Sequence, residues 1–155
     1  MNTTAEPLNQ FKVNQLISGA LIAGILVFIA VGFTVQENYT WDYDPDDFIL
    51  PLSFLLLVFG AAAALFLVKS LVIPGENNLI AKVGNYQTRT IAHMAFLEAP
   101  AVLAIFLFIS IGCLWYLMIP FFSICFMLYL FPGKNKFISE YELSFEEKRI
   151  LDKMN

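Results

Sequence analysis

Four long apolar segments follow one another along the chain, and shorter polar stretches separate them. A helix needs about 20 mostly apolar residues to cross the hydrocarbon core of a bilayer. The pattern therefore predicts an all-α membrane protein with four transmembrane helices. We expect these helices, packed as an antiparallel bundle, over about residues 14–35, 48–73, 86–111 and 113–131, with the turn between the last two at Gly112.

The polarity of the chain changes after the fourth segment, which predicts two regions. Residues 1–133 form the expected transmembrane domain, and residues 134–155 form a polar cytoplasmic tail. Within the tail, Ser144 stands three residues before Glu147, which is the pattern of a capping box. This pattern predicts a short amphipathic helix over about residues 145–153, and a frayed polar tail is the alternative.

The charged residues between the segments predict the orientation. The stretch Gln36–Asp47 carries five acidic residues and no Lys or Arg. All nine basic residues lie before the first segment, around the second connection or in the tail. Because basic residues remain on the cytoplasmic side of a membrane, we expect both termini in the cytoplasm and the acidic stretch outside.

The composition agrees with a chain embedded in lipid. Hydrophobic residues make up 59% of the chain and charged residues 14%, whereas a soluble domain is about one quarter charged. The lipid bilayer is therefore an expected partner, and nucleic acid is not, because no basic patch with interleaved aromatic residues occurs. Cys113 and Cys125 lie about 18 Å apart on one helix, beyond the reach of a disulfide. Without clustered histidines they predict no metal site.

Small residues recur in the first two apolar segments. Two pairs of small residues stand four positions apart in the first segment, Gly19 with Ala23 and Ala20 with Gly24. The second segment contains five consecutive small residues, from Gly60 to Ala64. Small side chains allow two helix backbones to approach closely in a membrane. We expect the first two helices to cross at these positions, and a face for self-association is the alternative.

Glu98 is an acidic residue inside the third apolar segment. Counted from Tyr86 at 1.5 Å per residue, it lies about 18 Å along the expected helix, near the middle of the membrane. A carboxylate at that depth costs about 2.5–3.5 kcal/mol on insertion scales, so such residues are functional candidates by default. We expect Glu98 to be either protonated and hydrogen-bonded or ionised and paired.

Two prolines predict helix kinks. Pro100 offers no N–H to the carbonyl of Phe96, and Pro120 leaves the carbonyl of Tyr116 free in the same way. A protonated Glu98 would donate to such a free carbonyl. The alternative is that both prolines are merely tolerated, because proline is common in membrane helices. We favour this alternative for Pro120, and the interpretation of Pro100 stays open.

The expected ion or proton site combines Glu98 with Lys69 and His93. Lys69 lies near the cytoplasmic end of the second helix and is a better partner for Glu98 than Arg89 or His93, but we favour the alternative that its side chain extends to the lipid headgroups. Arg89 and His93 are four residues apart and share one helix face, which Glu98 does not share. A lone histidine is more often a packing residue than a switch.

The stretch "YQTRTIAHMAFLEAP" at Tyr86–Pro100, with the short basic and acidic tail, resembles small four-helix inner-membrane proteins of bacteria. This resemblance covers nearly the whole chain and implies the bacterial cytoplasmic (inner) membrane. Residues 60–109 are also locally similar to the proteolipid (c) subunits of rotary ATPases, through a small-residue helix, a basic loop and "TIAHMAFLEA". The second resemblance implies that Glu98 takes the place of the ion-carrying carboxylate.

The sequence contains no pattern of an enzyme. It has no Ser/His/Asp constellation, no glycine-rich phosphate loop and no HExxH motif, so we expect neither catalysis nor a cofactor. The predicted role is that of a small structural or accessory protein, which packs against a larger membrane complex or associates with itself. The alternative is a proton- or ion-handling membrane component that uses Glu98.

Overall fold

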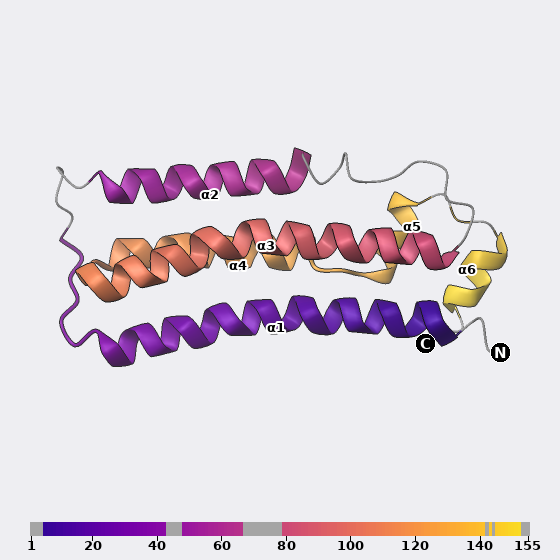
Figure 1. Cartoon of the computed structure of the whole chain (residues 1–155), viewed down its shortest axis with the longest axis horizontal. Coiled ribbons are helices and arrows are strands. Elements are labelled where there is room, and N and C mark those ends of the chain that lie inside the picture. Colours follow the sequence, from indigo (N-terminus) through magenta and orange to yellow (C-terminus); the bar gives the residue numbers. More distant parts are fainter. Residues whose placement is uncertain (1–4, 43–47, 67–78, 142, 144, 153–155) are drawn as a thin grey trace.

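The structure is a computed structural model of the chain, and it describes residues 5–42, 48–66, 79–141, 143 and 145–152. Within these ranges the regular elements are helices (Figure 1), apart from one isolated bridge between Thr40 and Cys113. The prediction of an all-α protein is therefore confirmed for the described residues. The helices are α1 (Ala5–Val35), α2 (Ile49–Phe66), α3 (Leu79–Ile111), the 3₁₀ helix η2 (Leu114–Leu117), α4 (Met118–Leu130), α5 (Lys134–Glu140) and α6 (Phe145–Asp152).

Three helices are long and apolar enough to cross a membrane: α1 from Asn9 onward, α2 and α3. A fourth candidate joins the stretch Leu114–Leu130 with α5, which follows it at an angle of 69°. The four residues of η2 and the thirteen of α4 rise about 28 Å at 2.0 and 1.5 Å per residue, close to the hydrocarbon thickness of about 30 Å. Length and composition thus support three membrane-spanning helices, and four when the bent pair is counted.

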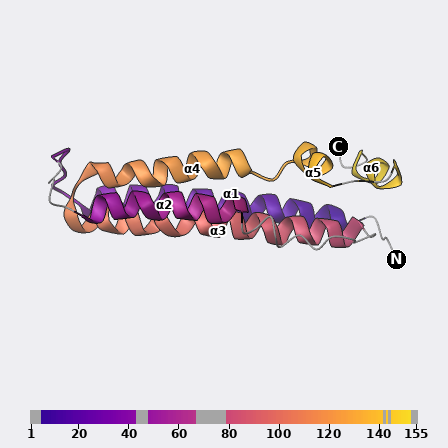
Figure 2. The same ribbon diagram turned by 90° about the horizontal axis from the view of Figure 1, so that it is seen from above.

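The long helix α3 lies at the centre and packs against α1, α2 and α4. Figure 1 shows α1 and α2 on opposite sides of α3 and α4, and Figure 2 gives the same helices from above. In Figure 1, α1 and α3 run in the same direction along the long axis. Their contact extends from the stacked rings of Phe11 and Tyr86, 6.2 Å apart, to Gly32 against Phe108 at the other end.

The predicted crossing of the first two helices at their small residues is not the main contact of either helix. On α1, Gly19 and Gly24 have open space where a side chain would project, and Ala20 and Ala23 are exposed. On α2, Gly60 packs against α3 instead. Small residues permit a close approach, but they do not specify which helix approaches, and here α3 lies between α1 and α2.

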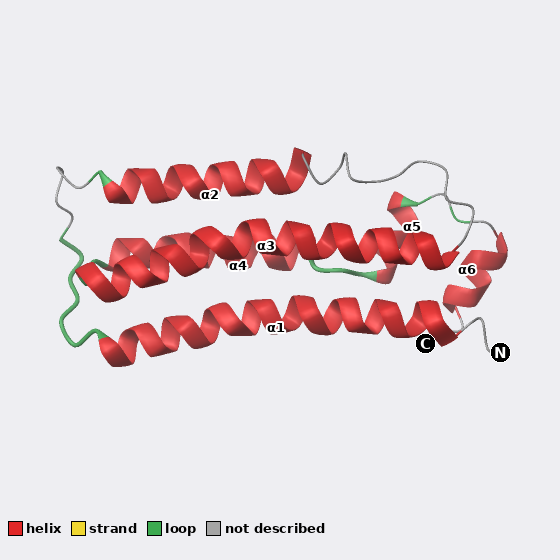
Figure 3. Ribbon diagram, in the orientation of Figure 1, coloured by secondary structure: helices red, strands yellow, loops and turns green. Residues whose placement is uncertain are grey.

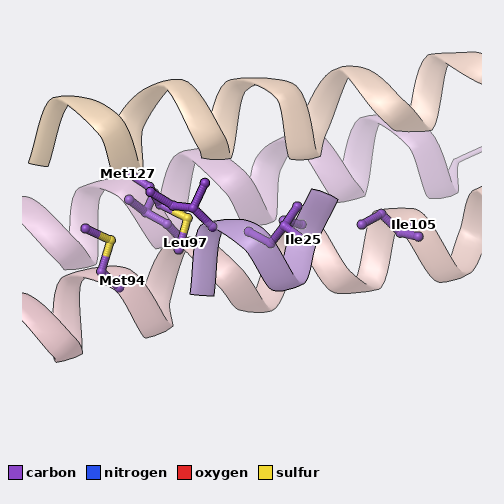
Figure 4. Close-up of a cluster of buried hydrophobic side chains, with 7 residues drawn as sticks. Ile25, Met94, Leu97, Ile105 and Met127 are labelled. Carbon is purple, nitrogen blue, oxygen red and sulfur yellow. The ribbon is translucent and has the colours of Figure 1, made fainter. Parts of the chain in front are cut away.

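The largest apolar cluster lies between α1, α3 and α4. Figure 4 shows Ile25, Met94, Leu97, Ile105 and Met127 directed into the same space. Four of these five side chains are completely buried, and Ile105 is nearly so. Because lipid is as apolar as these side chains, the cluster stabilises the helices mainly through close van der Waals contacts.

We call one end of the molecule the tryptophan end. There the beginning of the acidic stretch is hydrogen-bonded to the turn between α3 and η2. The N–H of Thr40 donates to the carbonyl of Gly112 at 2.9 Å, and the N–H of Leu114 donates to the carbonyl of Thr40 at 3.0 Å. The indole of Trp115 donates to the carbonyl of Trp41 at 2.9 Å. Figure 3 shows both connections as loops. The described part of the acidic stretch is therefore hydrogen-bonded to the turn between α3 and η2 and to Trp115.

Gly112 permits the turn at the tryptophan end. Its φ angle of +78° lies in the left-handed region, which only glycine adopts at little cost. A methyl group there would also lie 2.6 Å from the carbonyl oxygen of Asn38 and would collide with the side chain of Gln36. The turn predicted at Gly112 thus depends on glycine for its backbone conformation and for the space that it leaves.

At the opposite end, α5 and α6 lie over the beginnings of α1 and α3 (Figure 2). Phe137 of α5 is completely buried, with its ring centroid 5.1 Å from that of Tyr86 and 6.4 Å from that of Phe11. We call Phe11, Tyr86, Phe137 and Tyr141 the aromatic cluster. Glu147 of α6 forms an ion pair with Lys82 of α3 at 3.0 Å. The predicted tail helix is present as α6, whereas α5 was not predicted, and Ser144 lies outside the described residues.

The aromatic cluster also explains why two helices begin earlier than predicted. α1 begins at Ala5 instead of near residue 14, and α3 begins at Leu79 instead of near residue 86. The additional turns bury Phe11 and Val83 against Phe137 and its neighbours. Packing with α5 therefore extends both helices beyond their apolar segments. Residues 67–73 of the predicted second helix lie outside the described residues.

Candidate functional site

Glu98 is partly buried on α3, between the buried residues Leu97 and Ala101. Phe96 and Pro100, two positions before and after it, contact α2. Because two residues turn an α-helix by about 200°, Glu98 projects from the side of α3 away from α2. Glu98 forms no hydrogen bond or ion pair with any residue that the structure describes. Glu98 is therefore a neighbour on α3 of Leu97 and Ala101, which belong to the large apolar cluster.

The structure does not bring the predicted trio of Glu98, Lys69 and His93 together. Lys69 lies outside the described residues, so its pairing with Glu98 stays a prediction. Glu98 follows His93 by five positions, which correspond to about 140° around α3, and the two side chains therefore leave the helix on different sides. His93 faces the backbone of Ala64 on α2 instead.

Pro100 lies inside the continuous helix α3. The carbonyl of Phe96, which Pro100 leaves without a helical donor, packs against Gly60 of α2. A methyl group on Gly60 of α2 would lie only 2.6 Å from the carbonyl oxygen of Phe96 and 3.6 Å from the Pro100 ring. This carbonyl is the one that loses its helical donor because Pro100 has no N–H. The backbone of α2 therefore packs directly on the interrupted turn, against the carbonyl to which a protonated Glu98 would donate.

The fourth helix was predicted over residues 113–131, but Pro120 does not lie in the middle of a regular helix. The chain forms the 3₁₀ turn Leu114–Leu117 first, and α4 begins at Met118. Pro120 is thus in the first turn of α4, where a missing N–H costs little because that group has no helical acceptor. The chain changes from 3₁₀ to α geometry close to this proline, for which we favoured a tolerated position over a kink.

A cavity of about 660 Å³ lies where α2 and α4 end, between these helices, α3 and α5. Its wall combines charged and aromatic side chains that are far apart in the sequence. It is lined by Leu65, Phe66, Tyr86, Arg89, Thr90, His93, Tyr129, Leu130, Lys136 and Glu140. Of the residues singled out in the sequence, His93 and Arg89 lie here, and Glu98 does not.

The cavity contains two cations and one carboxylate. The guanidinium of Arg89 forms an ion pair with Glu140 at 2.9 Å. The ammonium of Lys136 donates to the carbonyl of Tyr129 at 2.6 Å and lies 4.9 Å from the centroid of the same tyrosine ring. One positive charge therefore remains without a carboxylate among the residues that line the cavity.

Two nitrogen atoms in the wall are buried without a hydrogen-bond partner among the described residues: Nε2 of His93 and Nε of Arg89. The His93 side chain is only 7% exposed. Buried polar atoms in proteins are normally partnered by protein or by ordered water. The cavity wall therefore presents two polar atoms that can form hydrogen bonds with a ligand or with water.

The sequence did not predict Lys136, Glu140 or Tyr129 as parts of one site. The tail after residue 133 was expected to be separate from the helices, and the fold of α5 brings Lys136 and Glu140 back to Arg89. Tyr86 and Tyr129 were recognisable only as aromatic residues near one end of an apolar segment. No local pattern indicates a contact across the 51 positions between Arg89 and Glu140.

No group of three or more His, Cys, Asp or Glu side chains suited to a metal ion occurs in the part of the chain that the structure describes. Both cysteines are free: Cys113 is buried at the tryptophan end, and Cys125 is exposed on α4. A second, apolar groove of about 430 Å³ lies between α2 and α3, beside Gly60, Phe96 and Pro100.

Comparison of the chain with protein-family models, with curated proteins and with solved structures finds no match. The resemblances to small bacterial inner-membrane proteins and to proteolipid subunits therefore rest on the sequence stretches given above. They enter the functional argument as predictions.

Proposed function

We propose that the protein is a small polytopic protein of the bacterial cytoplasmic membrane, with four spans in an antiparallel bundle and both termini in the cytoplasm. The three long apolar helices support this proposal, as does the rise of about 28 Å along η2 and α4. The charge distribution supports an orientation with α5, α6 and the aromatic cluster on the cytoplasmic side and the tryptophan end outside.

Within the membrane, the proposed role is that of a non-enzymatic accessory protein that packs against a larger membrane partner or a second copy. One observation carries this role: the small residues of α1 are not used inside the fold. Ala20 and Ala23 are exposed, and Gly19 and Gly24 adjoin open space. Such a face allows another helix to approach closely, which is the usual use of small residues in membrane helices.

Photo-cross-linking in native membranes tests this role. A photoreactive amino acid at Ala23 is expected to capture one discrete protein partner or a second copy, whereas the same group at Val58, exposed on α2, is expected to capture lipid. Ala23→Leu should reduce the amount of the cross-linkable complex, because the larger side chain blocks the approach, and Val58→Leu should not. Capture of lipid alone at Ala23 would exclude this face as a partner site.

The alternative function is proton or ion handling by Glu98. The observation in its favour is a partly buried carboxyl group on a long apolar helix, without a polar partner in the described ranges. Intramembrane carboxyl groups of this kind are often sites of proton or ion transfer. In proteoliposomes, the wild type would then show a proton or cation flux that Glu98→Gln abolishes and that Glu37→Gln, in the exposed loop, leaves unchanged. Absence of flux through the wild type would exclude the alternative.

A further inference from the structure

The cavity at the end of α2 lies at the boundary between an apolar surface and a charged one. Phe66 and Tyr129, on its rim, are 75% and 74% exposed and belong to helices with apolar outer faces. The charged side of the cavity is formed by Lys136 and Glu140 of α5 and by Arg89 of α3. With the membrane placement proposed above, on which this inference rests, the boundary falls at the cytoplasmic headgroup layer.

The charges in the cavity favour an anion. Among the described residues that line the cavity, Glu140 is the one carboxylate beside Arg89 and Lys136, so one positive charge is available to a ligand. Lys136 has three N–H groups, and its hydrogen bond to the Tyr129 carbonyl uses only one. A phosphate group offers several strong acceptor oxygens and is bound well by lysine and arginine together.

The unpartnered nitrogen atoms also point to a ligand. Nε of Arg89 and Nε2 of His93 are buried in the wall of the same cavity, on one face of α3. The Nε–H of Arg89 is a donor to phosphate oxygens, whereas the His93 ring donates through Nδ1 to the Ala64 carbonyl, so its Nε2 is an acceptor that suits a hydroxyl group of the ligand. Leaving buried polar groups unpaired costs about 1–3 kcal/mol each, which an oxygen-rich ligand in the cavity would offset.

We propose that this cavity binds the phosphate group of an anionic ligand, namely the headgroup of a membrane phospholipid. Lys136 and the free side of Arg89 hold the phosphate oxygens, and His93 lines the floor. A volume of about 660 Å³ is within the usual range for small-molecule sites and accommodates a glycerophosphate group. The apolar rim formed by Leu65, Phe66 and Leu130 lies where the acyl chains begin. Glu140 competes with the ligand for Arg89.

Native mass spectrometry of the full-length protein in detergent tests the proposal, with phosphatidylglycerol compared with phosphatidylcholine of the same acyl chains. We expect tighter binding of phosphatidylglycerol, and a loss of about tenfold with Lys136→Gln, the typical effect of one charge-assisted hydrogen bond. Glu140→Gln should strengthen binding, because the guanidinium of Arg89 is released. Lys12→Gln is the matched control, since Lys12 is exposed at the same end of the molecule and does not line the cavity.

Equal binding of the two lipids would overturn the proposal, because the positive charge of the cavity would then not select an anionic headgroup. Equal weakening by Lys12→Gln and Lys136→Gln would also overturn it, because that result indicates attraction to the positive surface in general. If Lys136→Gln lowers the thermal unfolding midpoint, its weaker lipid binding has a second explanation. Stronger binding of phosphatidylglycerol by Glu140→Gln then supports the proposal, and unchanged or weaker binding contradicts it. Glycerol 3-phosphate is added as a competitor. If glycerol 3-phosphate at millimolar concentration displaces the lipid, the cavity binds phosphate groups, including those of soluble molecules. If it does not displace the lipid, the ligand is the lipid headgroup. These measurements in detergent depend neither on membrane orientation nor on a protein partner.

Discussion

Gly60 and Pro100 show how single residues set the distance between two helices. Pro100 removes the donor to the Phe96 carbonyl, and Gly60 brings the backbone of α2 against that same carbonyl. A Cα–H group that points at a carbonyl oxygen forms a weak favourable contact in membrane helices, and it requires this close approach. The proline and the glycine therefore act as a pair, although they lie in different segments of the sequence.

We predict that Gly60→Ala destabilises the protein by about 1–3 kcal/mol, the usual cost of overpacking. Its methyl group would lie 2.6 Å from the carbonyl oxygen of Phe96 on α3, and this clash is relieved only if α2 and α3 move apart. Gly24→Ala is the matched control, because open space surrounds that position and alanine is the better helix former. Thermal unfolding in detergent, followed by tryptophan fluorescence, measures both variants. An equal unfolding midpoint for the two would contradict the close approach at Gly60.

α5 is the element that converts a polar tail into part of the fold. Its seven residues are too few to form a stable helix in isolation. Phe137 is completely buried, and Glu140 is paired with Arg89. Tertiary contacts with the beginnings of α1 and α3 therefore hold α5 as a helix, and its local composition does not.

We predict that Phe137→Ala releases α5 from the aromatic cluster. Truncation of a buried phenylalanine costs about 3–5 kcal/mol, which corresponds to an increase of at least about a hundredfold in local opening. Trypsin cleavage after Lys134 and Lys136 should accelerate accordingly. Phe145→Ala is the control, because that side chain is 83% exposed, and its cleavage rate should match the wild type. Equal rates for the two variants would show that Phe137 does not hold α5.

In the whole molecule, the long helices α1, α2 and α4 are aligned along α3 (Figure 1), and side-chain contacts connect the chain at both ends. At the tryptophan end the rings of Trp41 and Trp115 meet edge to face, 5.7 Å apart. At the opposite end the aromatic cluster and the ion pair between Lys82 and Glu147 join the tail to α1 and α3. Aromatic residues at both ends of apolar helices are typical of the two membrane interfaces.

The proposed orientation predicts which positions a membrane-impermeant maleimide reaches in intact cells. Glu37→Cys, exposed near the tryptophan end, should react directly from outside. Lys148→Cys, exposed on α6, should react only after permeabilisation. The wild type supplies the background from Cys113 and Cys125. Reaction of the Lys148→Cys variant in intact cells would reverse the proposed orientation.

The sequence by itself determined the helical class, the approximate position of the apolar segments and the turn at Gly112. These features are local, because they depend on the length of an apolar run or on the backbone freedom of one glycine. The position of Glu98 on a different face from Arg89 and His93 also followed from helical periodicity alone.

Only the tertiary structure decided which helices touch and which residues meet. The small residues of α1 were expected to contact α2, but α3 lies between the two helices, and Gly60 meets Phe96 instead. The cavity that joins Arg89, His93 and Lys136 exists because α5 folds back, and α5 is stabilised by contacts with residues far away in the sequence. Periodicity fixes the face on which a side chain lies, but the neighbour of that face is chosen by the packing of the whole chain.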